Sequence, residues 1–205
     1  MLDLHGFTTG NTYRAAVALE ESGLAYRQIP VNLGAGEHKG AAYRLVNATG
    51  RVPTLVDPDG PGGQPLVLTQ SNAIILYVAE KSGKLLPESA LDRARAFEWF
   101  FFFITDVIAP TNQGSFLKRS GIPEAEPAAR RLDEQAVSMY AHVEQRLEQS
   151  EYLAGNTFSI ADIPAYTVTS YLKPHRSAEL PAVKRWMETV ASRPGVQRGM
   201  AAFRQ

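Results

Sequence analysis

The sequence contains no cysteine among its 205 residues. This absence excludes disulfide bonds, thiolate metal sites and a cysteine nucleophile, so any thiol chemistry must use a thiol that the substrate brings. An excess of charge of one sign is also lacking, because 21 Lys and Arg residues balance 21 Asp and Glu residues. The balance gives no argument for binding nucleic acid, an anionic membrane surface or polyanionic substrates.

Hydrophobic runs long enough to span a bilayer are missing as well. The longest apolar stretch, FEWFFFFI, is shorter than the roughly 20 residues that a spanning helix needs, and it carries Glu98 and Asp106 near its ends. The first residues, MLDLHGF, lack the basic region and apolar run of a signal peptide. With 44% hydrophobic and 20% charged residues, we expect a soluble, cytoplasmic protein.

The hydrophobic pattern divides the chain into two unlike parts. In the first part, short apolar runs alternate with helical patterns, which predicts a small α/β unit with a mixed sheet of about four strands. The predicted elements are a strand at 2–4, a helix at 11–22, a strand at 26–31, a hairpin at 53–68 and a helix at 71–81. The period is then helical, with helices predicted at 91–119, 126–150, 160–172 and 181–192. We therefore expect an α/β domain, a linker and an all-helical domain, at residues 1–82, 83–90 and 91–205.

A proline stands where the first strand of the hairpin should begin, in the stretch RVPTLV. Proline at the start of a strand is tolerated because its missing N–H need not join the ladder, and a trans bond is the ordinary form. A cis Val52–Pro53 bond would instead turn the backbone outward and leave the Val52 N–H and C=O free to pair with an extended peptide. Spacing alone leaves both interpretations open.

The polar pair Gln70-Ser71 interrupts an apolar run just before the helical stretch NAIILYVAE. Ser71 fits as the N-cap of that helix, because serine is a favoured cap. A helix N-terminus with free N–H groups beside a Gln-Ser pair is also suited to binding a carboxylate. The sequence leaves both roles open.

The order of these features resembles the soluble glutathione transferase family. The resemblance rests on the strand–helix–strand unit, the Val-Pro before a hairpin, the Gln-Ser that opens the next helix and the all-helical remainder. It implies a thioredoxin-like first domain in which Val52 and a cis Pro53 hold the cysteinyl part of glutathione, while Gln70 and Ser71 bind the γ-glutamyl carboxylate. It also implies glutathione as co-substrate, no metal, and a homodimer.

The motif TFSIADIPAY resembles the capping box on a central helix of that family. In such a box, Ser159 accepts a hydrogen bond from the Asp162 N–H while the Asp162 carboxylate accepts one from the Ser159 N–H. We therefore expect Asp162 to be structural rather than catalytic.

Several classes of the family place a tyrosine, serine or cysteine at the glutathione sulfur. This chain has none of the three between His5 and Thr12. Its Thr9-x-Asn11 pattern is most similar to the bacterial Nu class, whose members hold the sulfur with a threonine hydroxyl and an asparagine amide; both groups can donate to a thiolate without ionising. The alternative is that Thr9 and Asn11 only cap the helix. His5 is a conceivable base, but we expect it to be structural.

Other residues have expected roles in binding glutathione. His38 or Lys39, in the loop GEHKG, can meet the glycyl carboxylate, although a solvated polar loop is an equal alternative. Arg131 resembles an arginine that some Nu-class proteins direct at the sulfur or at the second half of a disulfide; Arg130 is its rival, and an exposed helix arginine is the plain alternative. The resemblance also gives Asp106 a role at the γ-glutamyl amine in the neighbouring subunit.

The electrophile pocket is expected to be mostly apolar, as small-molecule sites are. The helix FEWFFFFITDVIAP is rich in aromatic residues, and an apolar helix of this kind is usually core or dimer interface. We expect Trp99, Phe102 and Phe103 along one side of it. Phe102, together with Phe7 and Phe116, is a candidate for the pocket.

The leading interpretation is an enzyme that stabilises the glutathione thiolate and directs it to an apolar electrophile or to a disulfide. In disulfide reduction glutathione must supply both thiols, because the chain has no cysteine. Isomerisation and dehalogenation, which occur in the wider family, rank lower. The rival interpretation is a non-catalytic protein of the same fold, a ligand carrier or an assembly module. Nucleic acid and membranes are not expected as partners.

Overall fold

The computed structural model describes residues 1–174 and 180–204, and contacts divide the chain into two compact units. The first unit comprises Met1–Leu85 and the chain from Ser192 onward, and the second comprises Leu86–Ala191. Within the described residues, no helix is both long and apolar enough to cross a membrane.

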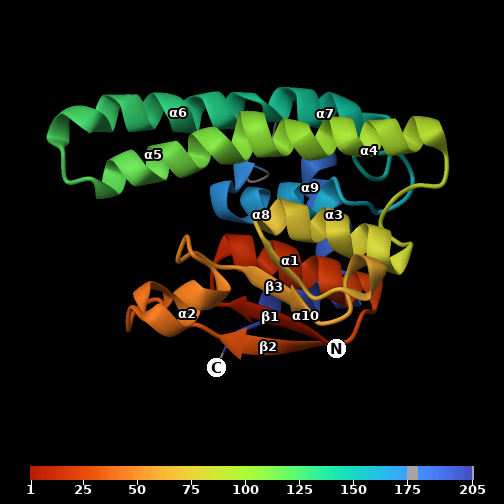
Figure 1. Cartoon of the computed structure of the whole chain (residues 1–205). Helices are drawn as coiled ribbons and strands as arrows, with labels where there is room; N and C mark the ends of the chain where they lie inside the picture. The colour runs from red at the N-terminus through yellow and green to blue at the C-terminus, as the bar shows by residue number, and fades with distance from the viewer. Residues whose placement is uncertain (175–179, 205) are drawn as a thin grey trace. The chain divides into compact units, whose positions relative to one another are not determined.

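A four-stranded mixed sheet forms the centre of the first unit (Figure 1). The order is β2-β1-β3-β4, in which β1 and β2 are parallel and the other pairs are antiparallel. The strands are β1 (Leu2–Gly6), β2 (Tyr26–Pro30), β3 (Thr54–Asp57) and β4 (Leu66–Thr69). Leu2 and Leu4 share the buried side of β1, because successive side chains of a strand point to opposite faces. The predicted mixed sheet and its hairpin are confirmed.

Helices cover this sheet, and α1 and α3 pack against each other over it (Figure 1). The helical elements of the first unit are α1 (Gly10–Ser22), η1 (Glu37–Lys39), α2 (Ala41–Val46), η2 (Pro61–Gly63), α3 (Ser71–Ser82) and α10 (Pro194–Ala201). α1 begins after Thr9 and ends at Gly23, whose φ of 76° is in the left-handed region that glycine adopts without steric cost. Its small apolar side chains are fully buried, which brings the start of α1 close to the sheet.

α10 packs so closely on α1 that one of its two glycines, Gly199, has no room for a side chain. A Cβ at Gly199 would lie 2.5 Å from the Cα of Val17. The Glu21 carboxylate, at the end of α1, accepts a hydrogen bond from the Val196 N–H at 3.1 Å. This helical stretch falls in the all-helical domain predicted at residues 91–205, but its contacts group it with the sheet.

Replacing Gly199 by alanine is expected to lower the free energy of unfolding by about 1–3 kcal/mol, because the added methyl group forces α10 away from α1. Gly10→Ala is the matched control, since an added Cβ there meets nothing within 4 Å. Chemical denaturation of both variants measures the difference. Equal stabilities would show that the contact between α10 and α1 is looser than described.

The second unit is built from helices. They are α4 (Ala90–Phe102), the π-helical turn η3 (Phe103–Ile108), α5 (Ala109–Arg119), η4 (Pro123–Ala125), α6 (Glu126–Ser138), α7 (Tyr140–Glu148), α8 (Asp162–Leu172) and α9 (Pro181–Ala191). The predicted helix over 91–119 is interrupted at η3, where the Ala109 N–H donates to the Ile104 carbonyl five residues back. Pro110 follows directly, and its missing N–H and bulky ring disfavour ordinary α-helical spacing there. The predicted helix over 126–150 is two helices, α6 and α7.

The buried carboxylate of Asp162 connects three segments of the second unit. It accepts from the Ser159 N–H at 2.9 Å, the Ser159 hydroxyl at 3.3 Å, the Leu153 N–H at 3.1 Å and the Trp186 Nε1–H at 2.9 Å. Burial raises the pKa of Asp162 to about 6, and these hydrogen bonds act in the opposite direction. One half of the predicted capping box is confirmed, but the Ser159 hydroxyl accepts from the Ala161 N–H, at 3.3 Å, and not from Asp162. The Asp162 N–H donates instead to the Ser159 carbonyl, as in a tight turn.

Candidate active site

Four loops leave the sheet of the first unit at the same end. His5 of β1 pairs with Thr54 of β3, Thr54 pairs with Thr69 of β4, and Gly6 pairs with Pro30 of β2. The loops that follow β1, β2 and β4 and the loop that precedes β3 therefore start from neighbouring positions. These loops and the helix starts that follow them carry most of the residues predicted to bind glutathione: Thr9, Asn11, His38, Lys39, Val52, Pro53, Gln70 and Ser71.

Thr9 is the N-cap of α1. Its Oγ1 accepts from the Thr12 N–H at 3.2 Å and lies 3.0 Å from the Thr12 Oγ1. The capping role considered from the sequence is therefore present for Thr9. Capping uses a lone pair of the hydroxyl oxygen and does not use the hydroxyl proton. An anion would need that proton as its hydrogen-bond donor.

Asn11 lies in the first turn of α1 with an exposed side chain, and it is not the cap. Its Oδ1 accepts from the Arg14 guanidinium at 2.7 Å. Arginine has donors only, so the oxygen of the Asn11 amide must face Arg14 and the NH2 group must face away. Arg14 is 6% exposed, and burial lowers its pKa to about 10, which leaves it a cation at neutral pH. A buried positive charge thus lies in contact with Asn11 at the positive end of the helix dipole.

The Val52–Pro53 bond is cis, which confirms the form implied by the family resemblance. The ladder of β3 begins at Thr54, so Val52 lies outside it. Val52 is therefore placed before the strand, in the loop at the shared end of the sheet.

A buried polar network fixes the loop that contains Val52 and Pro53. The Arg51 carbonyl accepts from the Tyr43 hydroxyl at 2.8 Å and from the Asn47 Nδ2 at 2.7 Å. The same two side chains reach the Thr54 Oγ1, at 2.9 Å and 3.0 Å. Burial raises the pKa of Tyr43, so its hydroxyl keeps the proton that it donates. The residues on both sides of Val52-Pro53 are thereby fixed.

Gln70, rather than Ser71, occupies the N-cap position of α3. The backbone of Gln70 has φ 70° and ψ 112°, and its side chain makes no capping hydrogen bond. A positive φ costs a non-glycine residue of the order of 1–3 kcal/mol, and such strain is concentrated at functional sites. Ser71 is the first residue of α3 and is buried, so the prediction of a Ser71 N-cap is wrong.

His38 and Lys39 lie in η1, in the loop that follows β2. Among the residues that the structure describes, nothing hydrogen-bonds the buried Nδ1 of His38. Nδ1 is thus unpaired whether it acts as donor or acceptor. The neutral ring has one N–H to offer, on either nitrogen. The Lys39 side chain is exposed.

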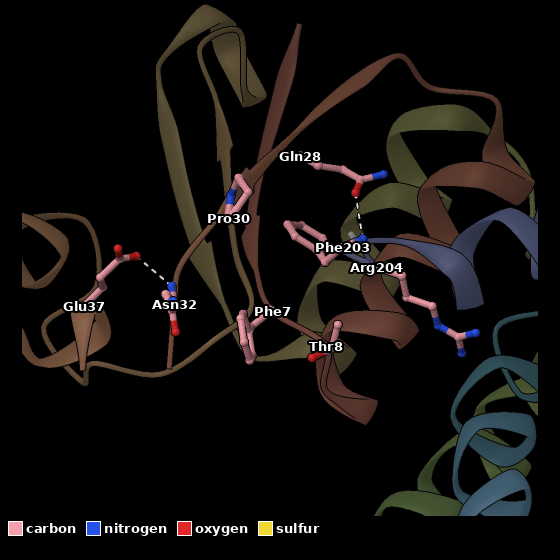
Figure 2. Close-up of a pocket in the computed structure, with 8 residues that line it drawn as sticks. All are labelled: Phe7, Thr8, Gln28, Pro30, Asn32, Glu37, Phe203 and Arg204. Atoms are coloured by element: carbon pink, nitrogen blue, oxygen red, sulfur yellow. Dashed lines mark hydrogen bonds between the residues drawn. The ribbon is translucent and has the colours of Figure 1, made fainter. Parts of the chain in front are cut away.

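A hollow of about 610 Å³ opens beside the loop that follows β1 (Figure 2). Phe7, Pro30 and Phe203 give it apolar walls, and Glu37 and Arg204 bring charges. The segment that carries Phe203 and Arg204 is attached to the sheet, because the Phe203 N–H donates to the Gln28 Oε1 of β2 at 2.8 Å. Phe7, predicted to line an electrophile pocket, lines this hollow.

His5, the conceivable base, belongs to the ladder of β1 between Ile29 and Thr54. Burial lowers its pKa, and its ring lies 6.0 Å from that of Tyr43. This placement agrees with the structural role expected for His5.

The charged residues predicted for the site from the helical part lie in the second unit. Arg131 and its rival Arg130 are both exposed on α6. Asp106 lies in η3, where its carboxylate accepts from the Thr105 hydroxyl at 2.9 Å.

The aromatic candidates of the second unit differ in their surroundings. Phe102 is half-buried and makes edge-to-face contacts with Trp99 and Phe103, at ring-centroid distances of 5.0 Å and 5.6 Å. The three rings therefore lie together, as the helical spacing predicts. Phe116, on α5, is 67% exposed.

The residues that support the site carry no clear signal in the sequence. Arg14 follows Asn11 at the i+3 spacing of a helix, but a pattern alone does not tell a buried arginine from an exposed one. Tyr43 and Asn47 lie in α2 and at its end, and only the tertiary fold brings them to Arg51. The turn-forming stretch Asn-Ala-Thr-Gly was the available signal for Asn47.

Comparisons with known proteins give the same picture across the chain. Residues 11–81 match the model of the glutathione S-transferase N-terminal domain, and residues 99–194 match that of the C-terminal domain. The chain is 32% identical, over 95% of its length and 92% of the relative, to the disulfide-bond oxidoreductase YfcG of Escherichia coli. It is 30% identical to glutathione S-transferase F9 of Arabidopsis thaliana, over 99% of its length and 98% of the relative.

Solved structures of glutathione transferases also resemble the chain over nearly its whole length. A glutathione transferase from Burkholderia graminis, with two glutathione molecules per subunit, superposes with a TM-score of 0.88 at 29% identity, over 98% of this chain and 88% of that one. A glutathione transferase from Pseudomonas putida, with one glutathione disulfide per subunit, superposes with a TM-score of 0.85 at 26% identity, over 98% and 91%.

Proposed function

The chain belongs to the glutathione S-transferase family, and we propose that it is an enzyme that binds glutathione at the shared end of its sheet and transfers the thiolate to a second substrate. The observation that carries this proposal is the strand register. It brings the loops after β1, β2 and β4 and the loop before β3 to one place. Two helices, α1 and α3, begin at that end, and their positive dipole ends suit an anionic ligand.

Thr9 and Asn11 stabilise the thiolate in this proposal. A free thiol has a pKa of ~8.5, and lowering it by about two units takes roughly 2.7 kcal/mol. A hydrogen bond to a charged group contributes about 1.5–3 kcal/mol, so one or two donors are enough. The Asn11 NH2 group is directed away from Arg14 and is free to be one of them. The Thr9 hydroxyl is the other.

The rest of glutathione binds in extended form. The main chain of Val52 pairs with the cysteinyl part, as a strand added at the edge of the sheet. Gln70 and Ser71 bind the γ-glutamyl carboxylate at the start of α3. A ring N–H of His38 or the ammonium of Lys39 binds the glycyl carboxylate, and the His38 Nδ1, which has no partner among the described residues, supports this contact.

The second substrate is an apolar electrophile or a disulfide. In disulfide reduction, the first thiolate attacks one sulfur, forms a mixed disulfide and releases the other sulfur as a thiolate; a second glutathione thiolate then attacks the mixed disulfide and gives glutathione disulfide and the second free thiol. The chain has no cysteine to replace either glutathione. A relative named as a disulfide-bond oxidoreductase supports this reaction, and the apolar walls around Phe7 support conjugation.

Residues of the second unit and of a second copy of the chain have their own proposed roles. Arg131 binds the second half of the disulfide, Phe102 and Phe116 contact the electrophile, and Asp106 reaches the γ-glutamyl amine across a homodimer. Leu45 on α2, at 90% exposure, and Phe101 on α4, at 51%, are apolar surfaces of the kind that a partner subunit covers.

Calorimetry with glutathione and with glutathione disulfide tests the proposal, together with assays of conjugation and of disulfide reduction on the same protein. We expect binding of at least one form and turnover in at least one assay. The faster reaction names the main activity. A protein that binds neither form would be using the fold for a different purpose, and the proposal would be wrong.

Asn47→Ala is expected to raise the Kd for glutathione about 3- to 10-fold, because the loop that presents Val52 loses two hydrogen bonds from below. Thr49→Ala is the matched control: it removes a hydroxyl that donates to Asn47 and leaves the bonds to Arg51 and Thr54 in place. Calorimetric titration compares the two variants. If Asn47→Ala bound glutathione like the unmodified protein, the loop would not be the binding edge.

A further inference from the structure

Thr12 carries a buried hydroxyl directly beneath the proposed sulfur site. Its side chain is 0% exposed, at the third position of α1. Its Oγ1 lies 3.0 Å from the Thr9 Oγ1 and accepts from the Phe7 N–H at 3.4 Å. Its methyl group fills the space in front of Gly6, where a Cβ would lie 2.4 Å from the Thr12 Cγ2. Thr12 is therefore held in a fixed position between the end of β1 and the cap of α1.

The protons of these two hydroxyls can be assigned by counting donors and acceptors. The Thr9 Oγ1 already accepts from the Thr12 N–H. The Thr12 hydroxyl is buried and needs an acceptor for its proton, and among the described contacts the Thr9 Oγ1 is the acceptor that lies within reach. If Thr9 donated to Thr12 instead, the Thr12 proton would be left buried and unpaired, which costs about 1–3 kcal/mol.

The assignment leaves one proton free. With Thr12 as donor, both lone pairs of the Thr9 oxygen are occupied, one by the Thr12 N–H and one by the Thr12 hydroxyl. The Thr9 proton must then point to a group outside this pair. Donors in a chain also polarise one another, so a hydroxyl that accepts two hydrogen bonds is a better donor.

We propose that Thr12 is a positioning residue that directs the Thr9 hydroxyl proton toward the glutathione sulfur. The order of donors is Phe7 N–H to Thr12, Thr12 to Thr9, and Thr9 to the thiolate. No proton is transferred along this chain; each hydroxyl keeps its own. The inference rests on the proposed function, because it gives the Thr9 proton a thiolate as its acceptor.

Thr12→Val tests the inference, because valine keeps the shape of threonine and removes the hydroxyl. Without the hydrogen bond from the Thr12 hydroxyl, the Thr9 hydroxyl is free to rotate and donates less strongly. We expect the pKa of the bound glutathione thiol to rise by about 0.5 unit, which corresponds to a roughly threefold lower rate at pH values well below that pKa. The rate should recover at higher pH, and the KM for glutathione should change by less than about twofold. Thr12→Ser keeps the hydroxyl and should restore the thiol pKa.

The thiol pKa is read from the ultraviolet absorbance of the bound thiolate as the pH is changed. Thr9→Val and the double variant Thr9→Val/Thr12→Val complete a cycle. If Thr12 acts through Thr9, the double variant has the same thiol pKa as Thr9→Val alone. Additive shifts, or a Thr12→Val thiol pKa equal to that of the unmodified protein, would overturn the inference. If Thr12→Val does not fold by circular dichroism, Thr12→Ala in comparison with Thr12→Ser takes its place.

Different results would contradict the proposed thiolate site and the proposed role of Thr12. If glutathione bound to the unmodified protein titrates like free glutathione, the proposed thiolate site is wrong and Thr12 has no anion to serve. If the bound thiol has a lowered pKa that Thr12→Val and Thr12→Ala leave unchanged, the site stands and only the role of Thr12 is wrong.

Discussion

Asn11→Ala is expected to lower kcat/KM for the glutathione-dependent reaction by about 10- to 100-fold. The Asn11 NH2 group is directed away from Arg14, and its loss removes a hydrogen bond to a charged sulfur that contributes about 1.5–3 kcal/mol. Affinity for glutathione should change by less than about threefold, because Val52, Gln70 and Ser71 are untouched. The rate loss should shrink as the pH approaches the pKa of the free thiol, since the thiolate then forms without help.

Two controls separate this role from a structural one. Asn156→Ala removes an exposed amide from a loop of the second unit and should leave kcat/KM unchanged. Asn11→Asp keeps the oxygen that accepts from Arg14 and replaces the donor by an anion, so it should be at least as inactive as Asn11→Ala. An Asn11→Asp variant with full activity would show that the amide donor does not face the sulfur.

Asp162→Ala is expected to cost about 3–5 kcal/mol of unfolding free energy at neutral pH. Four buried donors would lose their acceptor together: the N–H and the hydroxyl of Ser159, the Leu153 N–H and the Trp186 Nε1–H. Unpaired buried polar groups are one of the few mechanisms behind the largest effects of single substitutions. Denaturant unfolding, followed by circular dichroism, measures the loss.

Ser159→Ala is the matched control, because it removes one donor, the Ser159 hydroxyl at 3.3 Å, and leaves the other three on the carboxylate; it should cost about 1 kcal/mol. The pKa of Asp162 gives a further check. Because its folded value of about 6 lies above the ordinary value of 3.8, the folded state binds the proton more tightly, and the contribution of this group to stability falls as the pH rises from about 4 to about 6. That component of the pH dependence should disappear in Asp162→Asn. If it persisted, another group would be its source.

The elements of the first unit were predictable because each carries a local signal. These signals lie within a few residues of each element. They are the alternation of apolar and polar side chains in β1, the glycine that ends α1 and the proline before β3. The cis form of the Val52–Pro53 bond was not fixed by spacing; the resemblance to a family selected it. Ser71 shows the limit of local rules, since a favoured capping residue follows the cap position that the backbone of Gln70 occupies.

The supporting contacts were not predictable because they depend either on segments far apart in the chain or on burial that a local pattern does not show. α10 is short and glycine-rich, which is a poor helix signal, and its contact with α1 depends on the close approach of Gly199 to Val17. The π-helical turn before Pro110 could not be predicted, because it depends on the hydrogen-bond register of the whole helix. Arg14 resembles an exposed helix residue by pattern, and only its burial shows that it orients Asn11.

The pKa of glutathione bound to the unmodified protein tests the central claim most directly. Ultraviolet titration of the complex, with the Asn11→Ala variant beside it, measures that value. The account predicts a thiol pKa about two units below the ~8.5 of a free thiol in the unmodified protein, and a shift of at least one unit back toward it in Asn11→Ala. A bound thiol that titrates like free glutathione in both proteins would contradict it.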